Sequence, residues 1–406
     1  MRKFVISLAA CLCLSIQLRA QQASALARET VETIRDLRAV GIPEHSDMNG
    51  PPAQVPALLR TLNRQLRTLI IDTLNDSTRH GVVSEGEIFA QLRAAGWQEL
   101  PDQRWNAYGE ILAIRFDYQL GEDPGILIVT TRLWIPCGAD PDASIYVFQG
   151  HARRWQLLAA VDADYAAVGD DPGGLQYLLL PQDSSGNWYL AVANSPPSCR
   201  YELPPSVRYR LISQGASPDK LAVLLDERES LNPRFSPPFR LRAEFDWFSV
   251  TRGKIRKLDG EPSVAIARYS LTAGKLSRTS PIALTPEDFL EEWTQLGWDV
   301  AAQWSDAPAS SDVQTWHEKL NRLAEDSTEF KAVYSCEPLN GADATWLLLL
   351  WVDRQLNPST AEERFFVLVS KRLGAFYVDD MRSSRIPGCS SHPLPRSMDD
   401  LTLPGW

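Results

Sequence analysis

The sequence predicts an α+β protein with N-terminal helices, a central antiparallel all-β domain of about ten strands and a smaller C-terminal α+β domain. Three observations lead to this fold class. Apolar residues recur at helical spacing before residue 97, short strand-like runs fill residues 108–271, and helix patterns precede further strands after residue 285. No helical crossover interrupts the central runs, which favours antiparallel pairing.

The first twenty residues have the pattern of a secretory signal peptide. A basic start at Arg2 and Lys3 precedes an apolar run from Phe4 to Ile16, and Ala20 supplies a small residue for cleavage. Leu8–Cys11 also resembles the lipobox of bacterial lipoproteins, which would make Cys11 a lipid anchor, but the apolar core would then be unusually short. We therefore expect a bacterial protein that is secreted or periplasmic, with no integral membrane span.

We expect the remaining chain to divide into four parts. These are a helical segment over 21–100, the antiparallel β domain over 101–280, the α+β domain over 281–395 and an irregular tail over 396–406.

Two helices are expected in the helical segment before residue 75. The first covers residues 24–40, and the second covers Val55–Leu74, whose apolar residues alternate steps of three and four. This stripe has two interpretations. The stripe packs against the rest of the same chain, or it binds another chain as a partner helix in an assembly. The stripe is wide and short for a coiled coil, which favours packing within the same chain.

Two further helices have clear start signals. Ser84 with Glu87 forms a capping-box pattern before a helix that ends near Trp97, and Thr285 followed by Pro286 starts a helix with acids in its first turn. The two segments share a cap, an acid and a closing Gly-Trp at the same spacing, so an internal duplication is one hypothesis and two ordinary capped helices are the other.

The expected strands alternate with turn residues. In the central domain they cover 111–118, 126–134, 144–149, 154–161, 175–180, 187–193, 206–212, 220–226, 239–250 and 264–271. After the Thr285 helix and a second helix over 311–324, strands are expected over 330–335, 344–353, 365–370 and 375–379.

Four cysteines remain after removal of the signal peptide, and in an exported protein they predict two disulfides. They are Cys137, Cys199, Cys336 and Cys389. Sequence alone allows three connectivities. We favour Cys137–Cys199 and Cys336–Cys389, because each bridge then stays within one expected domain.

The charge balance argues against nucleic acid as a partner. Of the 41 basic residues three lie in the signal peptide, which leaves 38 against 51 acidic residues and a net charge of −13. An acidic chain without a basic run is a poor match for a polyanion.

No catalytic, cofactor-binding or metal-binding residue is predicted. The sequence contains neither a Gly-x-Ser-x-Gly elbow, nor a His-Glu-x-x-His pair, nor a nucleotide-binding glycine loop. The aspartates at 162, 164, 170 and 171 suggest calcium, but Ala166 and Gly173 stand where oxygen ligands are required. We interpret them as solvated turn residues.

The favoured function is an exported, non-enzymatic binding or envelope-associated protein of unknown ligand. The first alternative is a carboxylate-dependent hydrolase that acts on cell-envelope glycan or polysaccharide. The second is an assembly protein that uses the Val55–Leu74 helix. The thirteen tryptophans are expected mostly in the core, although exposed ones could stack on a sugar face.

Overall fold

The computed structural model describes most of the chain after residue 24. The described residues are 25–40, 52–76, 82–100, 107–119, 125–135, 142–151, 154–162, 175–180, 187–195, 206–232, 234–235, 237–244, 247–256, 260–272, 274–279, 282–305, 311–322, 328–339, 341–352 and 363–395.

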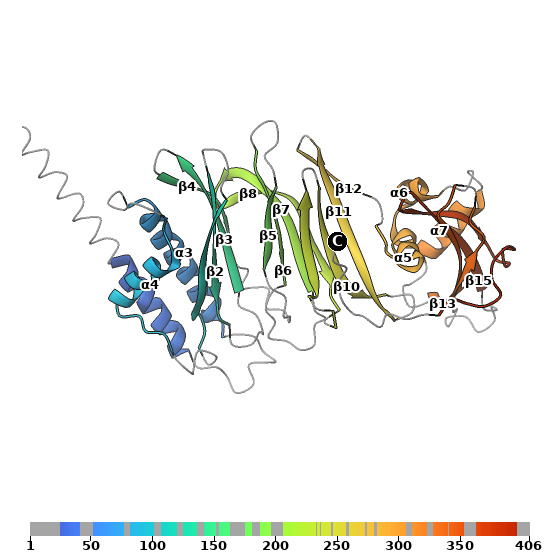
Figure 1. Ribbon diagram of the computed structural model, residues 1–406. Coiled ribbons are helices and arrows are strands. Elements are labelled where there is room, and N and C mark those ends of the chain that lie inside the picture. The colour runs from blue at the N-terminus through green and yellow to red at the C-terminus, as the bar shows by residue number, and fades with distance from the viewer. Residues whose placement is uncertain are drawn as a thin grey trace, which may run out of the picture. The chain divides into compact units, whose positions relative to one another are not determined.

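The α+β prediction is confirmed. The described strands form four four-stranded antiparallel sheets, in each of which strands consecutive in the chain are neighbours: β1–β4, β5–β8, β9–β12 and β13–β16 (Figure 1). The chain divides into two compact units, one made of Met1–Leu175 with Asn187–Arg228 and the other of Gln176–Gly186 with Glu229–Trp406. The domain limits expected from sequence stay predictions.

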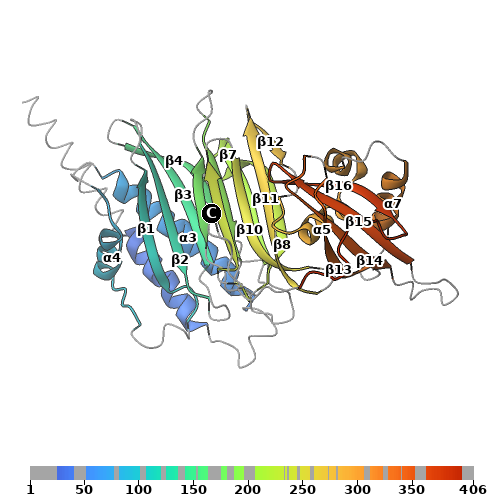
Figure 2. The same ribbon diagram turned by 45° about the vertical axis from the view of Figure 1, so that its right-hand side comes forward.

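In the first unit, helices cover one face of the first sheet (Figure 2). The helices are residues 25–39, α3 (Gln54–Leu74) and α4 (Glu85–Ala94), and the strands are β1 (Ile111–Gln119), β2 (Ile126–Leu133), β3 (Asp142–His151) and β4 (Arg154–Val161). The capping box of α4 is present, since the Ser84 N–H donates to the Glu87 carboxylate at 3.3 Å. This unit also contains β6 (Tyr189–Asn194), β7 (Ser206–Ser217) and most of β8 (Lys220–Ser230).

The α3 stripe is buried in the core of its own unit. Val55, Leu62, Leu66 and Leu69 are fully buried and pack with apolar residues of β1–β3. The partner-helix interpretation of Val55–Leu74 is therefore wrong, because the face that would bind another chain is already covered by this one. Asn63, on the same face, donates from its amide to Ser144 Oγ at 2.9 Å, which satisfies a polar group beneath the helix.

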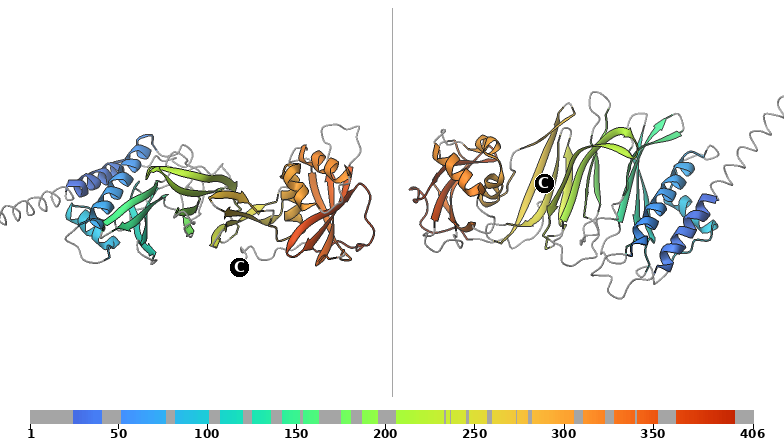
Figure 3. Two further views of the ribbon diagram at one scale, coloured as in Figure 1. Left: turned by 90° about the horizontal axis from the view of Figure 1, so that it is seen from above. Right: turned by 180° about the vertical axis from the view of Figure 1, so that it is seen from behind.

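In the second unit, the last sheet packs against three helices (Figure 3). The helices are α5 (Pro286–Gln295), α6 (Trp298–Ala301) and α7 (Ser311–Arg322), with a 3-10 turn over Ala302–Trp304. The strands are β13 (Thr328–Cys336), β14 (Ala344–Val352), β15 (Glu363–Arg372) and β16 (Ala375–Arg382). As expected, Thr285 caps α5: its hydroxyl oxygen accepts from the Asp288 N–H at 3.2 Å.

The second unit also contains β5 (Gln176–Leu180) and the sheet of β9 (Phe239–Glu244), β10 (Trp247–Ile255), β11 (Pro262–Thr272) and β12 (Lys275–Arg278). The strand expected over 239–250 is therefore two strands. Glu244 pairs with Trp247, so β9 and β10 form a tight hairpin. No Gly or Pro marks this turn, which is why the sequence pattern missed it.

Candidate functional site

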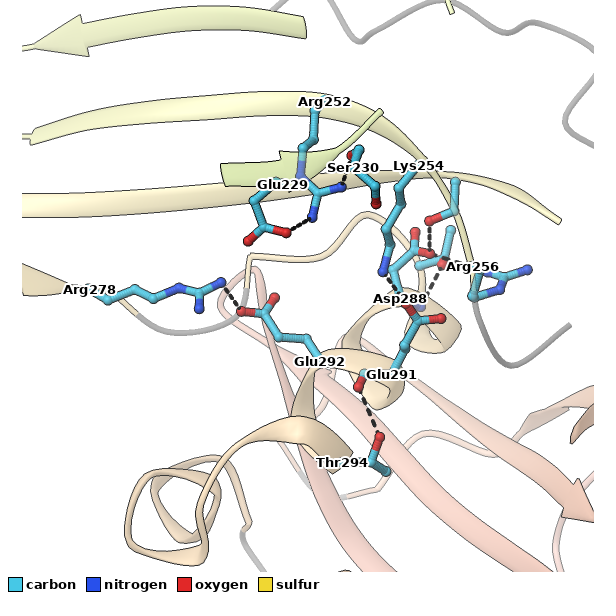
Figure 4. Close-up of polar contacts among 12 residues, drawn as sticks. Glu229, Ser230, Arg252, Lys254, Arg256, Arg278, Asp288, Glu291, Glu292 and Thr294 are labelled. Atoms are coloured by element: carbon cyan, nitrogen blue, oxygen red, sulfur yellow. Dashed lines mark hydrogen bonds and ion pairs between the residues drawn. The ribbon is translucent and has the colours of Figure 1, made fainter. Parts of the chain in front are cut away.

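A group of four ion pairs lies in the second unit and connects β10–β12 with α5 (Figure 4). Arg252 and Lys254 lie on β10, and Arg256 follows directly after it. Because side chains alternate across a strand, residues two apart point to the same face. One face of β10 therefore presents three cations, of which Lys254 and Arg256 meet acids of the helix.

The acids of α5 are arranged to meet these cations. Asp288, Glu291 and Glu292 stand at positions i, i+3 and i+4, which share one face of a helix. Phe289 and Trp293 point away from that face into the core shared with β13–β16. The helix thus has an acidic side toward β10–β12 and an apolar side toward the last sheet.

Each acid of this face is held by a cation within the cluster. Lys254 Nζ lies 2.5 Å from Glu291 Oε1, with side chains 12% and 4% exposed. Arg256 Nη1 lies 3.2 Å from Asp288 Oδ1, which also accepts from the Ser263 hydroxyl at 2.6 Å. We call these residues, with Arg252, Arg278, Glu229 and Glu292, the ionic cluster.

Two further ion pairs include the more exposed members of the cluster, Arg278 at 44% and Glu229 at 35%. Arg278 Nη2 lies 2.6 Å from Glu292 Oε1, and Arg252 Nη2 lies 2.7 Å from Glu229 Oε2. Arg252 also donates to the carbonyl of Ser230 at 2.7 Å. Burial raises the pKa of Glu292 above its ordinary value, and the charges of Arg278 and Lys254 oppose that rise.

A second feature of interest is the face of the β13–β16 sheet that lies opposite the helices. On β14, Leu350 and Val352 point into the helix-covered core, so Trp351 between them points to the opposite face. The half-buried Trp351 ring has Lys331 Nζ at 4.8 Å and the guanidinium of Arg364 at 4.9 Å from its centre. Cations at this distance from an indole are attracted by its electron-rich face.

A C-terminal arm, residues 386–394, lies against the same sheet. Cys336 and Cys389 form a disulfide, and Ile386 packs with Leu347 and Leu368. The N–H of Leu394 donates to the carbonyl of Val333 at 2.7 Å, so the arm also hydrogen-bonds to β13. Of the four predicted disulfide cysteines, Cys336 and Cys389 are thus joined, while Cys137 and Cys199 lie outside the described residues.

The aspartate turn considered for calcium is only partly described. Asp162 directly follows β4, and its Oδ2 lies 3.7 Å from Arg67 Nη1 of α3. The same Arg67 atom lies 2.6 Å from Asp219 Oδ1. Burial raises the pKa of Asp162, and Arg67 opposes the rise. The other three aspartates, at 164, 170 and 171, lie outside the described residues. Within the described part of the chain, no group of three or more His, Cys, Asp or Glu side chains is placed to hold a metal ion.

The histidines and tryptophans fall into distinct environments. His317 is buried on α7, whereas His151 and His392 are exposed, and the remaining two histidines lie outside the described residues. Trp293 is fully buried, and Trp351 is half-buried.

Sequence reasoning missed the ionic cluster, although both halves of it have a recognisable pattern. Arg252, Lys254 and Arg256 alternate along one strand, and the α5 acids follow helical spacing. The sequence does not show that these two faces meet.

Comparison with known proteins places this chain in no family. No family model matches it, and no curated protein does. Some solved structures are weakly similar. One is a glycoside hydrolase, at 9% identity over 73% of this chain and 99% of that chain, with a TM-score of 0.25. Another is an α-L-arabinofuranosidase from Fusarium graminearum, at 8% identity over 68% and 71%, with a TM-score of 0.23. A thermostable family-43 glycoside hydrolase has 8% identity over 70% and 80%, also with a TM-score of 0.23. Similarities this low carry no argument about fold or activity.

None of the described helices is long and apolar enough to cross a membrane.

Proposed function

We propose that this chain is an exported, non-enzymatic binding or envelope-associated protein, and that its ligand contacts the Trp351 face of the β13–β16 sheet. The observation that carries the proposal is the half-buried Trp351 ring between Lys331 and Arg364. Tryptophan and arginine are enriched among the residues that dominate binding energy, because a large ring with a flanking cation offers apolar, stacking and charged contacts together.

The state of the buried acids supports a binding role over a catalytic one. Asp288 and Glu291 are each held by a cation within 3.2 Å, and both carboxylates lie between packed secondary-structure elements. Acids arranged in this way hold α5 against β10–β12. The disulfide between Cys336 and Cys389 is typical of proteins that fold outside the cytoplasm, which supports export.

The hydrolase alternative also has one specific observation in its favour. Burial raises the pKa of both Glu292 and Glu287, and a general acid needs a raised carboxyl pKa to keep its proton near neutral pH. If the chain is a hydrolase, Glu292, at the more exposed end of the ionic cluster, is the candidate general acid.

One experiment separates the two proposals. The mature protein, beginning at residue 21, is incubated with insoluble peptidoglycan and, separately, with a neutral plant polysaccharide. Retention is measured by co-sedimentation, and cleavage is measured by release of reducing ends. We expect retention without cleavage on at least one probe.

Single-residue variants test whether the Trp351 face binds the ligand. Trp351→Ala should weaken retention by about tenfold or more, as expected for an interface tryptophan, and Arg364→Ala should weaken it less. Arg115→Ala removes an exposed cation from β1 and serves as the control. Unchanged retention in Trp351→Ala would reject the proposed surface. Cleavage that disappears in Glu292→Gln would establish the hydrolase instead, and the absence of both retention and cleavage would reject glycan as the ligand.

A further inference from the structure

The end of α5 is tied to α7 by two side chains. The last carbonyls of a helix have no partner within that helix and need donors from elsewhere. His317 Nε2 lies 3.0 Å from the carbonyl oxygen of Trp293. One turn further along α7, Asn321 Nδ2 donates to the carbonyls of Thr294 at 3.0 Å and Leu296 at 3.2 Å. Together the two side chains donate to three carbonyls at the end of α5, of which the Trp293 carbonyl also accepts from the Leu296 N–H at 3.3 Å.

These contacts fix the tautomer of the neutral His317 ring. A carbonyl oxygen only accepts hydrogen bonds, so Nε2 must carry the proton that it donates to Trp293. Nδ1 then has a lone pair, and this atom is buried with no hydrogen-bond partner among the described residues. The whole side chain is 1% exposed. Protonation would place a second N–H on Nδ1, a buried atom with no hydrogen-bond partner among the described residues.

The surroundings of the ring are apolar. The centre of the His317 ring lies 4.5 Å from that of Trp293, edge to face, and 5.3 Å from that of Trp298. Trp293 is itself fully buried and donates from Nε1 to the carbonyl of Ala301 at 3.1 Å. A buried imidazolium would therefore be surrounded mainly by rings and helix backbone.

Charged groups near this ring come from α7 itself and from α5, α6 and β16, and on β16 Asp379 pairs with Arg372 and Asp380 with Arg382. Glu318, the next residue on α7, favours the charged imidazole by its negative charge. On α5, Glu291 and Glu292 are engaged by Lys254 and Arg278, and on α6 Asp299 is exposed. On α7 itself, Lys319 lies over the ring of Trp316.

Desolvation is the largest influence on this histidine. Burial lowers the pKa of His317, while the Trp293 carbonyl, Glu318 and the Leu296 carbonyl act in the opposite direction and are smaller. A group with a depressed folded pKa contributes stability that is present above its unfolded pKa, about 6.5 for histidine, and is lost as pH falls through the folded pKa.

We propose that the His317 side chain forms a pH-sensitive contact between α7 and the end of α5. The contact is intact when the imidazole is neutral and breaks when the imidazole becomes charged. Protonation breaks the Nε2 contact with Trp293, because the charged ring must turn or move to find water for Nδ1. Separation of α7 from α5 exposes Trp293 and Trp298. Mild acid thereby uncovers an apolar, aromatic surface on the second unit, which goes beyond the proposed ligand face at Trp351.

Two measurements on the whole mature protein test this. The first follows the imidazole signals by NMR between pH 4.5 and 8. His317 should titrate below 6.5, the ordinary value for histidine. A His317 pKa at or above 6.5 would overturn the proposal, because it would mean that the tryptophan rings stabilise the imidazolium. This measurement needs no variant.

The second measurement is amide hydrogen exchange of α5 and α7 at pH 5 and pH 7.5, corrected for the intrinsic effect of pH. Wild-type protein should exchange measurably faster in these helices at pH 5 than at pH 7.5 after that correction, because the charged ring loses its contact with Trp293. His317→Gln keeps a side-chain donor and cannot titrate, so it should lose this pH dependence, and His392→Gln should keep it. Carboxyls such as Glu292 remain in His317→Gln. An unchanged pH dependence in that variant would therefore assign the separation of α7 from α5 to the carboxyls and reject the proposed role of His317.

Discussion

Removing the cation from the buried Lys254–Glu291 pair should strongly destabilise the ionic cluster. The two charges are 2.5 Å apart, and the side chains are 12% and 4% exposed. At an effective dielectric of 20 their attraction is roughly 7 kcal/mol, most of which offsets the loss of hydration. Lys254→Met leaves Glu291 buried without this partner, and we expect a cost of about 3–5 kcal/mol. Lys254→Met with Glu291→Leu removes both charges and should recover most of that loss.

The assay is urea-dependent hydrogen exchange of α5 amides, because a chain of two units has no single unfolding free energy. The control is Arg322→Met, which breaks an exposed pair with Glu318 at 3.1 Å, where side chains are 78% and 40% exposed. That pair should be worth at most about 0.5 kcal/mol. Equal effects of Lys254→Met and Arg322→Met, or a double variant no more stable than Lys254→Met, would refute the reasoning.

Three further predictions concern other features of the second unit. Burial raises the pKa of Glu292 in the folded protein, so the stability that its proton contributes is fully present below about pH 4.3 and is lost as pH rises through the folded pKa. Glu292→Gln should therefore gain stability relative to wild type over that rise, measured by urea-dependent hydrogen exchange of α5 amides at a series of pH values, and a constant difference would contradict this. Replacing Cys336 and Cys389 together with alanine opens a loop with a sequence separation of 53 and should cost about 4 kcal/mol in the exchange of β13–β16 amides, whereas unchanged exchange would show that the bridge adds no stability. Gly253→Ala would place a Cβ 2.2 Å from Cδ2 of the buried Phe235 ring and should lower the local unfolding free energy, measured by hydrogen exchange of β10 amides, by about 1–3 kcal/mol. Gly150→Ala, whose nearest contact is 3.4 Å, should show a much smaller change in the exchange of β3 amides, and equal changes would contradict the steric argument.

The elements with strong local signals were predictable from sequence. The α3 stripe, the Ser84 and Thr285 caps and most strands follow from periodicity and capping chemistry, which are local properties. Both capped helices also precede a four-stranded meander, although the duplication hypothesis stays a prediction.

The contacts between distant segments were not predictable. Lys254 and Glu291 are 37 residues apart, and nothing in either segment specifies the other as its partner. The strand pattern shows that Trp351 alternates with buried residues, but only the packing of α5–α7 decides which face of the sheet is covered. His317 is similar: its helical position was expected, whereas its role in capping α5 depends on a carbonyl 24 residues away.

The bridge between Cys336 and Cys389 also determines how the last sheet responds to mechanical force. It closes residues 337–388, and with them β14, β15 and β16, into a covalent ring. Tension applied to the chain beyond Cys389 passes through the sulfur atoms directly to β13 and leaves the enclosed strands unloaded. A ligand or envelope component that pulled on this end of the chain would therefore leave these three strands folded until β13 itself detached, and reduction of the bridge would route the same force through the whole meander.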